Sequence, residues 1–199
     1  MGTAPRTPVF GAQLRDGGAQ FRLWAPDCQK IALCLDGPDV TAEVPLVRDA
    51  DGWCEHFVAG VRAGARYSYR IDGGLKVPDP ASRFQPDDVH GASELIDAGA
   101  YAWGCNDWRG RPWTEAVIYE LHIGTFSPEG TFRGALDRLD ALVELGITAI
   151  ELMPVADFPG ARDWGYDGVL LFAPDSRYGR PEDLKALIDA AHARGLMVF

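Results

Sequence analysis

Residues 162–168, Arg-Asp-Trp-Gly-Tyr-Asp-Gly, combine two aromatic rings with two carboxylates in one short segment. The segment follows the apolar run 149–155, which we interpret as a buried strand. The faces of a sugar ring are largely C–H and stack on aromatic rings, whereas its hydroxyls need charged or amide partners. The pattern therefore indicates a site for a polar, ring-shaped ligand. Its predicted substrate-binding residues are Tyr166, Trp164 and Asp167; the alternatives are a Trp164 that forms the core of the loop and an Asp167 that holds Tyr166 or the backbone in place.

Other polar residues near this segment have simpler structural interpretations. Glu120 and His122 lie two apart on a predicted strand, a spacing that suits a metal or an acid–base pair, but a single strand histidine is more often a hydrogen-bonded structural residue. Glu151 interrupts an apolar strand, so its carboxylate is expected to find an arginine or a backbone donor. Arg162 and Asp163 are expected to pair with each other in solvent. The sequence has no H-x-x-x-H, cysteine cluster or calcium-binding loop, so no metal and no cofactor is predicted.

The charge balance narrows the classes of partner. The 199 residues carry 29 Asp and Glu against 19 Lys and Arg, a formal net charge of −10, and the basic residues do not cluster. Phosphate backbones and anionic lipid surfaces repel such a chain, so we predict neither a nucleic-acid nor a membrane partner. A neutral polyol meets no such repulsion.

The termini and cysteines bear on location. Residues 1–6 lack the apolar core of a signal peptide, and a cytoplasmic location is predicted. Cys28, Cys34, Cys54 and Cys105 form no C-x-x-C pair, so free thiols are expected, although a Cys28–Cys54 or Cys34–Cys54 bridge stays open.

The first part of the chain has the period of short strands. Polar and apolar residues alternate in four segments that are separated by turn dipeptides such as Asp-Gly: 19–24, 30–35, 53–58 and 66–71. Strands at this spacing predict a β-sandwich. Pro78 and Pro80 then begin an irregular segment, in which Trp103, Trp108 and Trp113 fall five apart. That spacing fits neither a helix nor a strand, and we interpret these rings as pinning a connector onto a neighbouring domain.

From residue 116 the pattern changes to strand, helix, strand. An apolar strand at 116–123 precedes a helical pattern over 132–143, with Thr131 as N-cap and Gly146 as stop, and a second strand covers 147–155. A second helix begins at Pro181 and ends at Gly195. The apolar run 196–199 predicts a third strand, which the chain ends within, so we expect the front part of a larger protein. This alternation predicts parallel strands, in either a barrel or a doubly wound sheet.

Several segments resemble the α-amylase superfamily of glycoside hydrolases: 117–126, 131–132, 146–155 and 163–168. Within it the chain is most similar to the malto-oligosyltrehalose trehalohydrolase group, on the segments 77–86, 90–91 and 126–132. The resemblance implies an immunoglobulin-like β-sandwich followed by the first part of a (β/α)8 TIM barrel, truncated in strand three. The expected division is a β-sandwich domain at 1–77, a connector at 78–113 and a partial catalytic barrel at 114–199.

The resemblance also implies an activity. Members of this group cleave the α-1,4 bond next to the terminal trehalose unit of maltooligosyl trehalose and release trehalose. The tyrosine that matches Tyr166 stacks on the sugar at the cleavage point, whereas the alternative is a loop ring packed against the next helix. The family's nucleophile, acid/base and stabilising carboxylates follow strands four, five and seven, beyond Phe199. No catalytic residue is therefore assigned, and the 199-residue chain is predicted to be inactive.

Three alternatives remain open. A glucan branching enzyme would pass the same covalent intermediate to a sugar hydroxyl instead of water. A non-catalytic glucan-binding protein would carry the sandwich beside a vestigial barrel. On pattern alone, the chain also fits an unrelated α/β protein.

Overall fold

The computed structural model describes residues 10–37 and 40–199, so the N-terminal residues 1–6 lie outside the described part. The chain divides into two compact units, Met1–Asp97 and Ala98–Phe199.

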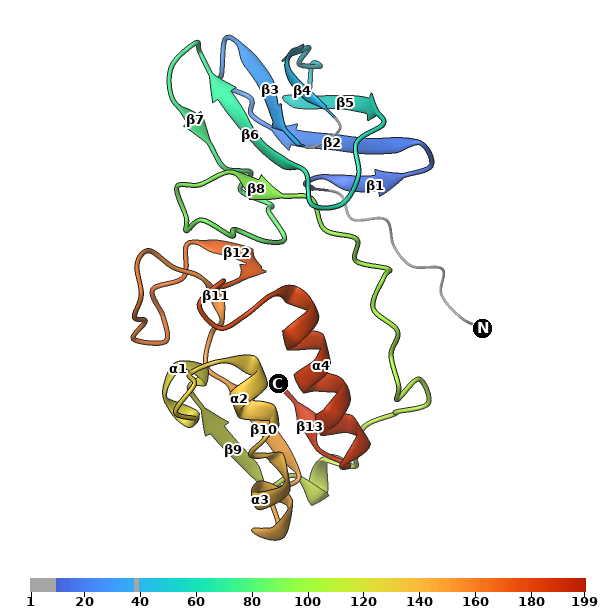
Figure 1. Ribbon diagram of the computed structural model, residues 1–199, viewed down its shortest axis with the longest axis vertical. Helices are drawn as coiled ribbons and strands as arrows, with labels where there is room; N and C mark the ends of the chain where they lie inside the picture. The colour runs from blue at the N-terminus through green and yellow to red at the C-terminus, as the bar shows by residue number, and fades with distance from the viewer. Residues whose placement is uncertain (1–9, 38–39) are drawn as a thin grey trace. The chain divides into compact units, whose positions relative to one another are not determined.

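The first unit is a sandwich of two antiparallel sheets (Figure 1). One sheet has the order β1 (Gln13–Arg15), β2 (Gly18–Trp24), β5 (Trp53–Ala59). The other has the order β4 (Thr41–Leu46), β3 (Ile31–Asp36), β6 (Arg66–Ile71), β7 (Lys76–Val77), and β8 (Ser93–Glu94) also pairs with β6. Alternate residues of the strands meet in one buried cluster that includes Phe21, Leu33 and Tyr69. The four predicted strands and the predicted sandwich are confirmed.

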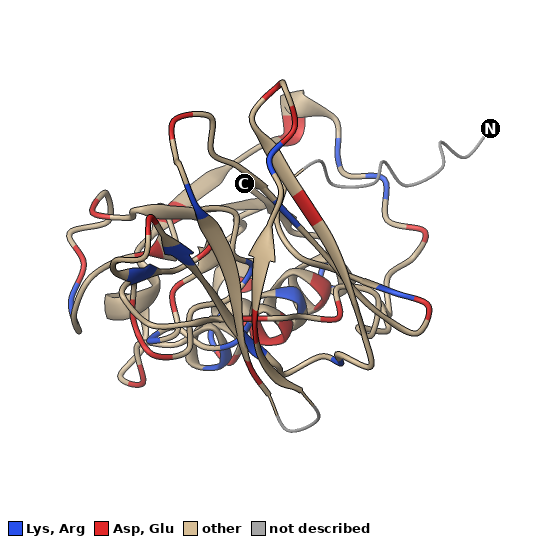
Figure 2. Ribbon diagram, turned by 90° about the horizontal axis from the view of Figure 1, so that it is seen from above, with Lys and Arg blue, Asp and Glu red and all other residues tan. Residues whose placement is uncertain are grey.

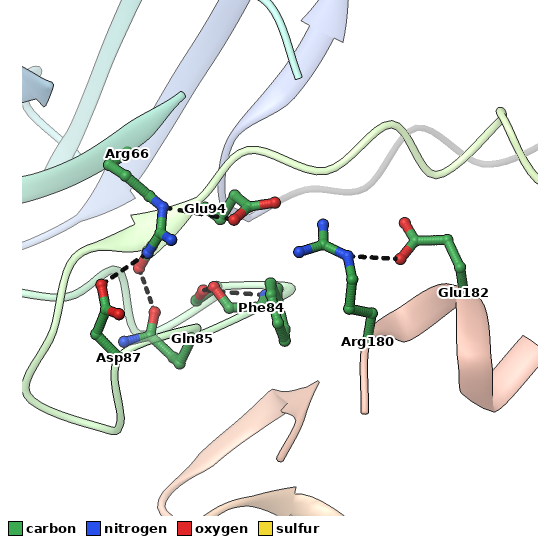
Figure 3. Close-up of polar contacts among 9 residues, drawn as sticks. Arg66, Phe84, Gln85, Asp87, Glu94, Arg180 and Glu182 are labelled. Atoms are coloured by element: carbon green, nitrogen blue, oxygen red, sulfur yellow. Dashed lines mark hydrogen bonds and ion pairs between the residues drawn. The ribbon is translucent and has the colours of Figure 1, made fainter. Parts of the chain in front are cut away.

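The segment 78–97 belongs to this first unit, whereas its irregular sequence predicts a connector. The reason is long-range pairing: Arg66 forms ion pairs with Asp87 (2.9 Å) and Glu94 (3.4 Å), as Figure 3 shows. Asp79 is fully buried, and its carboxylate accepts a hydrogen bond of 2.8 Å from the Tyr67 hydroxyl. A buried carboxylate needs such partners, so these contacts fix an otherwise irregular segment.

The second unit is built on a parallel sheet with the order β13 (Met197–Val198), β10 (Ala149–Leu152), β9 (Ile118–Leu121). One face of this sheet packs against α2 (Phe132–Leu136), α3 (Leu139–Glu144) and α4 (Pro181–Ala193) (Figure 1). The remaining elements are η1 (Trp113–Glu115), α1 (Ile123–Phe126) and the antiparallel pair β11 (Ala156–Asp157) and β12 (Leu170–Pro174). The predicted parallel arrangement is confirmed, whereas the β11–β12 pair was not predicted.

The helical pattern 132–143 forms two short helices instead of one. Asp137 and Arg138 separate α2 from α3, and the amide of Arg138 bonds to the carbonyl of Ala135 (3.0 Å), a tightened turn that ends α2. The predicted N-cap is confirmed, because the Thr131 hydroxyl accepts a hydrogen bond of 3.1 Å from the Gly134 amide.

The segment after Ala98 lies along α4, and one α4 carboxylate binds two of its backbone amides. Asp189, on α4, accepts hydrogen bonds from the amides of Gly104 (2.8 Å) and Cys105 (2.9 Å). These two backbone donors hold the pKa of Asp189 below its ordinary value, because they stabilise the charged form.

The three regularly spaced tryptophans have different environments. Trp108 stacks on His192 of α4, with ring centroids 5.0 Å apart and an interplanar angle of 16°. Trp103 packs edge-on against Tyr101 at 4.9 Å. These contacts confirm the packing interpretation for Trp108, but Trp113 is 71% exposed and does not fit it.

Acidic and basic residues are both scattered over the described chain, as Figure 2 shows. Within residues 10–37 and 40–199, we find no helix that combines the length and the apolar character needed to span a membrane. All four cysteines are free thiols, so neither of the two possible bridges forms.

We expect Thr131→Ala to lower the free energy of unfolding by about 1 kcal/mol, because the Gly134 amide loses its acceptor. Thr131→Ser keeps a hydroxyl and is the matched control. Urea unfolding followed by circular dichroism measures both, and equal stability of the two variants would contradict the capping role.

Asp189→Asn should lower the melting temperature at pH 7, because the amide meets the two backbone donors without a charge. Since the folded pKa of Asp189 is depressed, its stabilising contribution is fully present above the ordinary aspartate pKa of about 3.9 and is lost as the pH falls through the lower, folded value. The difference in melting temperature between the unmodified chain and the Asp189→Asn variant should therefore narrow below about pH 4. A difference that stays constant down to pH 2 would argue against this clamp.

Candidate functional site

The aromatic loop lies beyond the carboxyl-terminal end of β10, between β11 and β12. Trp164 is 89% exposed and Tyr166 is 73% exposed, so neither ring is packed into the core. The Asp167 carboxylate accepts a hydrogen bond of 3.1 Å from the Trp164 amide. The structure thus places the three predicted substrate-binding residues on one loop, with both rings facing solvent.

Asp163 organises this loop. Its Oδ1 atom accepts hydrogen bonds from the amides of Gly165 (2.8 Å) and Asp167 (3.3 Å), and its Oδ2 atom accepts one from the Tyr178 hydroxyl (3.3 Å). The predicted solvent pair with Arg162 is wrong: among the described residues no ion pair joins the two. A carboxylate next to turn amides satisfies local backbone donors in preference to a flexible exposed arginine.

His122 joins the end of β9 to the same loop. It is the N-cap residue of α1, and its Nε2 atom lies 3.2 Å from the carbonyl oxygen of Asp163. Because a carbonyl oxygen only accepts, Nε2 must carry the proton. The imidazole also packs edge-on against Tyr178, with centroids 6.1 Å apart and an interplanar angle of 86°. The structural interpretation of His122 is therefore confirmed.

The two strand glutamates lie elsewhere. Glu120 and Glu151 are register partners on β9 and β10, and both are exposed. The expectation that Glu151 is buried with a partner is wrong, because its neighbour Ile150 occupies the helix-covered face and alternation directs Glu151 to the other face.

A cavity of about 350 Å³ adjoins the loop, lined by residues that include His122, Thr125, Arg162, Asp163 and Tyr178. Tyr178 is 4% exposed, and burial, together with the nearby Asp163 carboxylate, raises its pKa well above the ordinary value, so its hydroxyl remains a donor. The cavity walls offer a guanidinium and a threonine hydroxyl, which suit a hydroxyl-rich ligand.

Sequence reasoning missed the roles of Tyr178 and Asp163. The sequence feature that could have indicated Tyr178 is Asp175, an aspartate at the end of an apolar segment. The Asp175 carboxylate accepts hydrogen bonds from the amides of Phe158 (3.0 Å) and Arg177 (2.7 Å), and it shapes the turn that carries Tyr178. Over residues 10–37 and 40–199 there is no cluster of three or more His, Cys, Asp and Glu side chains that could hold a metal ion.

A family model for the catalytic domain of alpha amylase matches residues 80–199, more than half of the chain. The chain belongs to the alpha-amylase family. A second model, carbohydrate-binding module 48 (isoamylase N-terminal domain), matches residues 9–82. Together with the two units of the structure, these matches confirm the predicted fold class, a β-sandwich followed by the start of an alpha-amylase barrel.

Individual relatives refine this placement within the alpha-amylase family. The malto-oligosyltrehalose trehalohydrolase of Deinococcus radiodurans is 45% identical over 196 residues, which are 98% of this chain and 32% of that protein. A 1,4-alpha-glucan branching enzyme of Corynebacterium jeikeium is 33% identical over 203 residues, covering 96% of this chain and 29% of that protein. A solved structure described as a putative alpha amylase from Salmonella typhimurium has a TM-score of 0.91 at 50% identity and covers 96% of this chain and 32% of its own. The chain therefore spans about a third of the length of these relatives.

Gly165 should be the position of the loop least tolerant of a side chain. Its φ is +100°, and an added Cβ would displace the Met153 methyl. Gly160 is the matched control, because its φ is +89° and nothing lies within 4 Å of an added Cβ. We expect Gly160→Ala to cost about 1–2 kcal/mol and Gly165→Ala more.

Thermal unfolding gives the stability of the two glycine variants, and amide hydrogen exchange of residues 163–167 reports on the conformation of the loop. Only Gly165→Ala should speed exchange at the Gly165 and Asp167 amides, since both bond to Asp163. Equal exchange rates in the two variants would show that the loop conformation does not depend on this glycine.

Proposed function

We propose that the chain is the N-terminal part of a glycoside hydrolase that cleaves the α-1,4 bond next to the terminal trehalose unit of maltooligosyl trehalose and releases trehalose. Residues 114–199 would be the opening part of its catalytic barrel. The observation that carries the proposal is the 45% identity with the D. radiodurans trehalohydrolase across nearly the whole chain, against 33% with the branching enzyme.

The aromatic loop is the part of this chain that would touch substrate. Barrel enzymes place their active sites on loops at the carboxyl-terminal ends of the strands, where residues 162–168 lie. The exposed Tyr166 and Trp164 rings would stack on the C–H faces of glucose units, and Asp167 would accept bonds from sugar hydroxyls. The adjoining cavity, with Arg162 and Thr125, offers further polar partners.

The bond cleavage itself would be carried out by carboxylates outside these 199 residues. In retaining glycosidases a nucleophile and an acid/base lie about 5–5.5 Å apart, and the covalent glycosyl intermediate is then released to water. The residues of this chain would bind and orient the reacting sugar, and orientation affects the chemical step as well as affinity. The four free thiols support a cytoplasmic location for this reaction.

A chimera tests the proposal, with this chain replacing the matching 196 residues of the D. radiodurans trehalohydrolase. The chimera should release trehalose from maltooligosyl trehalose, whereas the 199-residue chain alone should release none. Transfer products with new branch points in place of free trehalose would favour the branching alternative, and sugar binding without turnover would favour a non-catalytic one.

In this chimera, Tyr166→Ala should lower kcat/KM by about 10- to 100-fold, with a fall in kcat, because a misplaced sugar reacts slowly. Tyr166→Phe keeps the ring, so a small loss would mean that stacking dominates. Trp113→Ala is the matched control, since Trp113 is 71% exposed but precedes the opposite, amino-terminal end of β9. Normal kinetics in Tyr166→Ala, or a lowered melting temperature alone, would make Tyr166 a packing residue.

A further inference from the structure

The exposed ring of Tyr166 depends on its backbone for orientation. Because Tyr166 is 73% exposed, packing does little to fix the orientation of its ring. The amides immediately before and after it, those of Gly165 and Asp167, both bond to one atom, Oδ1 of Asp163 (2.8 and 3.3 Å). A single oxygen therefore restrains the main chain on both sides of Tyr166.

Asp163 is itself tied to the core of the second unit. Its Oδ2 atom accepts from the Tyr178 hydroxyl at 3.3 Å, and its carbonyl oxygen accepts from His122 Nε2 at 3.2 Å. Tyr178 is 4% exposed and packs against Phe132 and Phe158, with ring centroids 5.9 and 5.6 Å away. A continuous path of contacts thus runs from the buried core through Tyr178 and Asp163 to the loop.

The same geometry argues against direct chemistry by Asp163. Each of its two carboxylate oxygens already accepts at least one hydrogen bond from this chain, and those donors belong to the loop and the core. A group that acts on substrate as a base would need an oxygen directed at the reacting proton.

We propose that Asp163 is a positioning residue, which holds the Tyr166 ring in the orientation that stacks on the reacting glucose unit. The proposal rests on the function proposed above and adds a residue to the substrate-orienting part of the site. Its energetic basis is preorganisation: a ring held ready by the protein gives up less conformational freedom when the sugar binds.

The test uses the chimera and three variants. Asp163→Ala removes both acceptors and should lower kcat/KM by about 10- to 100-fold, with a fall in kcat, since a displacement of about 1 Å has effects of this order. Asp163→Asn keeps an oxygen for the two amides and can donate to the Tyr178 oxygen, so it should restore kcat/KM to within about threefold of the unmodified chimera. Asp137→Ala, on the exposed end of α2, is the control.

Combining Asp163→Ala with Tyr166→Ala separates positioning from other roles. If Asp163 acts through Tyr166, it should produce no further loss once the ring is gone. A loss that persists in the Tyr166→Ala background, or an Asp163→Asn variant as impaired as Asp163→Ala, overturns the proposal, because Asp163 would then act on substrate directly or through its charge. A change in melting temperature without any kinetic change overturns it as well.

The outcomes also distinguish the two proposals. Normal kinetics in Tyr166→Ala alone would contradict the proposed function, whereas an impaired Tyr166→Ala beside a normal Asp163→Ala would contradict only the positioning role. Should Asp163→Ala fail to fold, Tyr178→Phe removes the hydroxyl that anchors Oδ2. It should lower kcat/KM several-fold with Tyr166 present and have no effect without it, and any other pattern counts against the proposal.

Discussion

The second unit depends on one buried interface, the face of the parallel sheet that packs against α2, α3 and α4. Leu121, Ile150 and Leu187 lie in this interface and are at most 5% exposed. Burial of these side chains fixes the direction of β9 and β10, so that their carboxyl-terminal ends lie in register. His122 follows one strand end and the aromatic loop follows the other. The packing that stabilises the unit therefore also brings His122 and the loop within hydrogen-bonding distance.

Much of the fold could be predicted from local periodicity, because alternation in segments such as 19–24 and helical spacing from Pro181 onward reflect which side chains are buried. The role of residues 78–97 could not be predicted this way. This segment is held by the pairing of β8 with β6 and by the ion pairs of Arg66, contacts between residues distant in sequence. The break between α2 and α3 could not be predicted either, but there the cause is local. The regular helix is interrupted at Asp137 and Arg138, whereas the apolar spacing continues across them.

The candidate site was proposed from residue type, but its internal organisation was not predicted. Aromatic rings beside carboxylates in a loop after a strand suggested the segment 162–168, since a sugar needs both kinds of contact. A carboxylate in this segment can either bind a ligand or support the loop. The choice depends on the orientation of its side chain, which residue type and spacing do not give. Asp163 looked like a surface ion-pair partner and is the main acceptor of the loop, while Glu151 looked buried and is exposed because Ile150 occupies the helix-covered face.

The aromatic loop contains features that oppose stability. Burial of Trp164 and Tyr166 would contribute favourable free energy, yet both rings stay in solvent. Gly165 has a φ of +100°, a conformation that a side chain would strain, and a carboxylate and a buried tyrosine are used to maintain it. Local choices that cost stability persist where function requires them. The loop combines exposed rings with a restrained backbone. The proposed sugar-binding role would need both properties, because exposure provides the contact and a rigid loop loses little conformational entropy on binding.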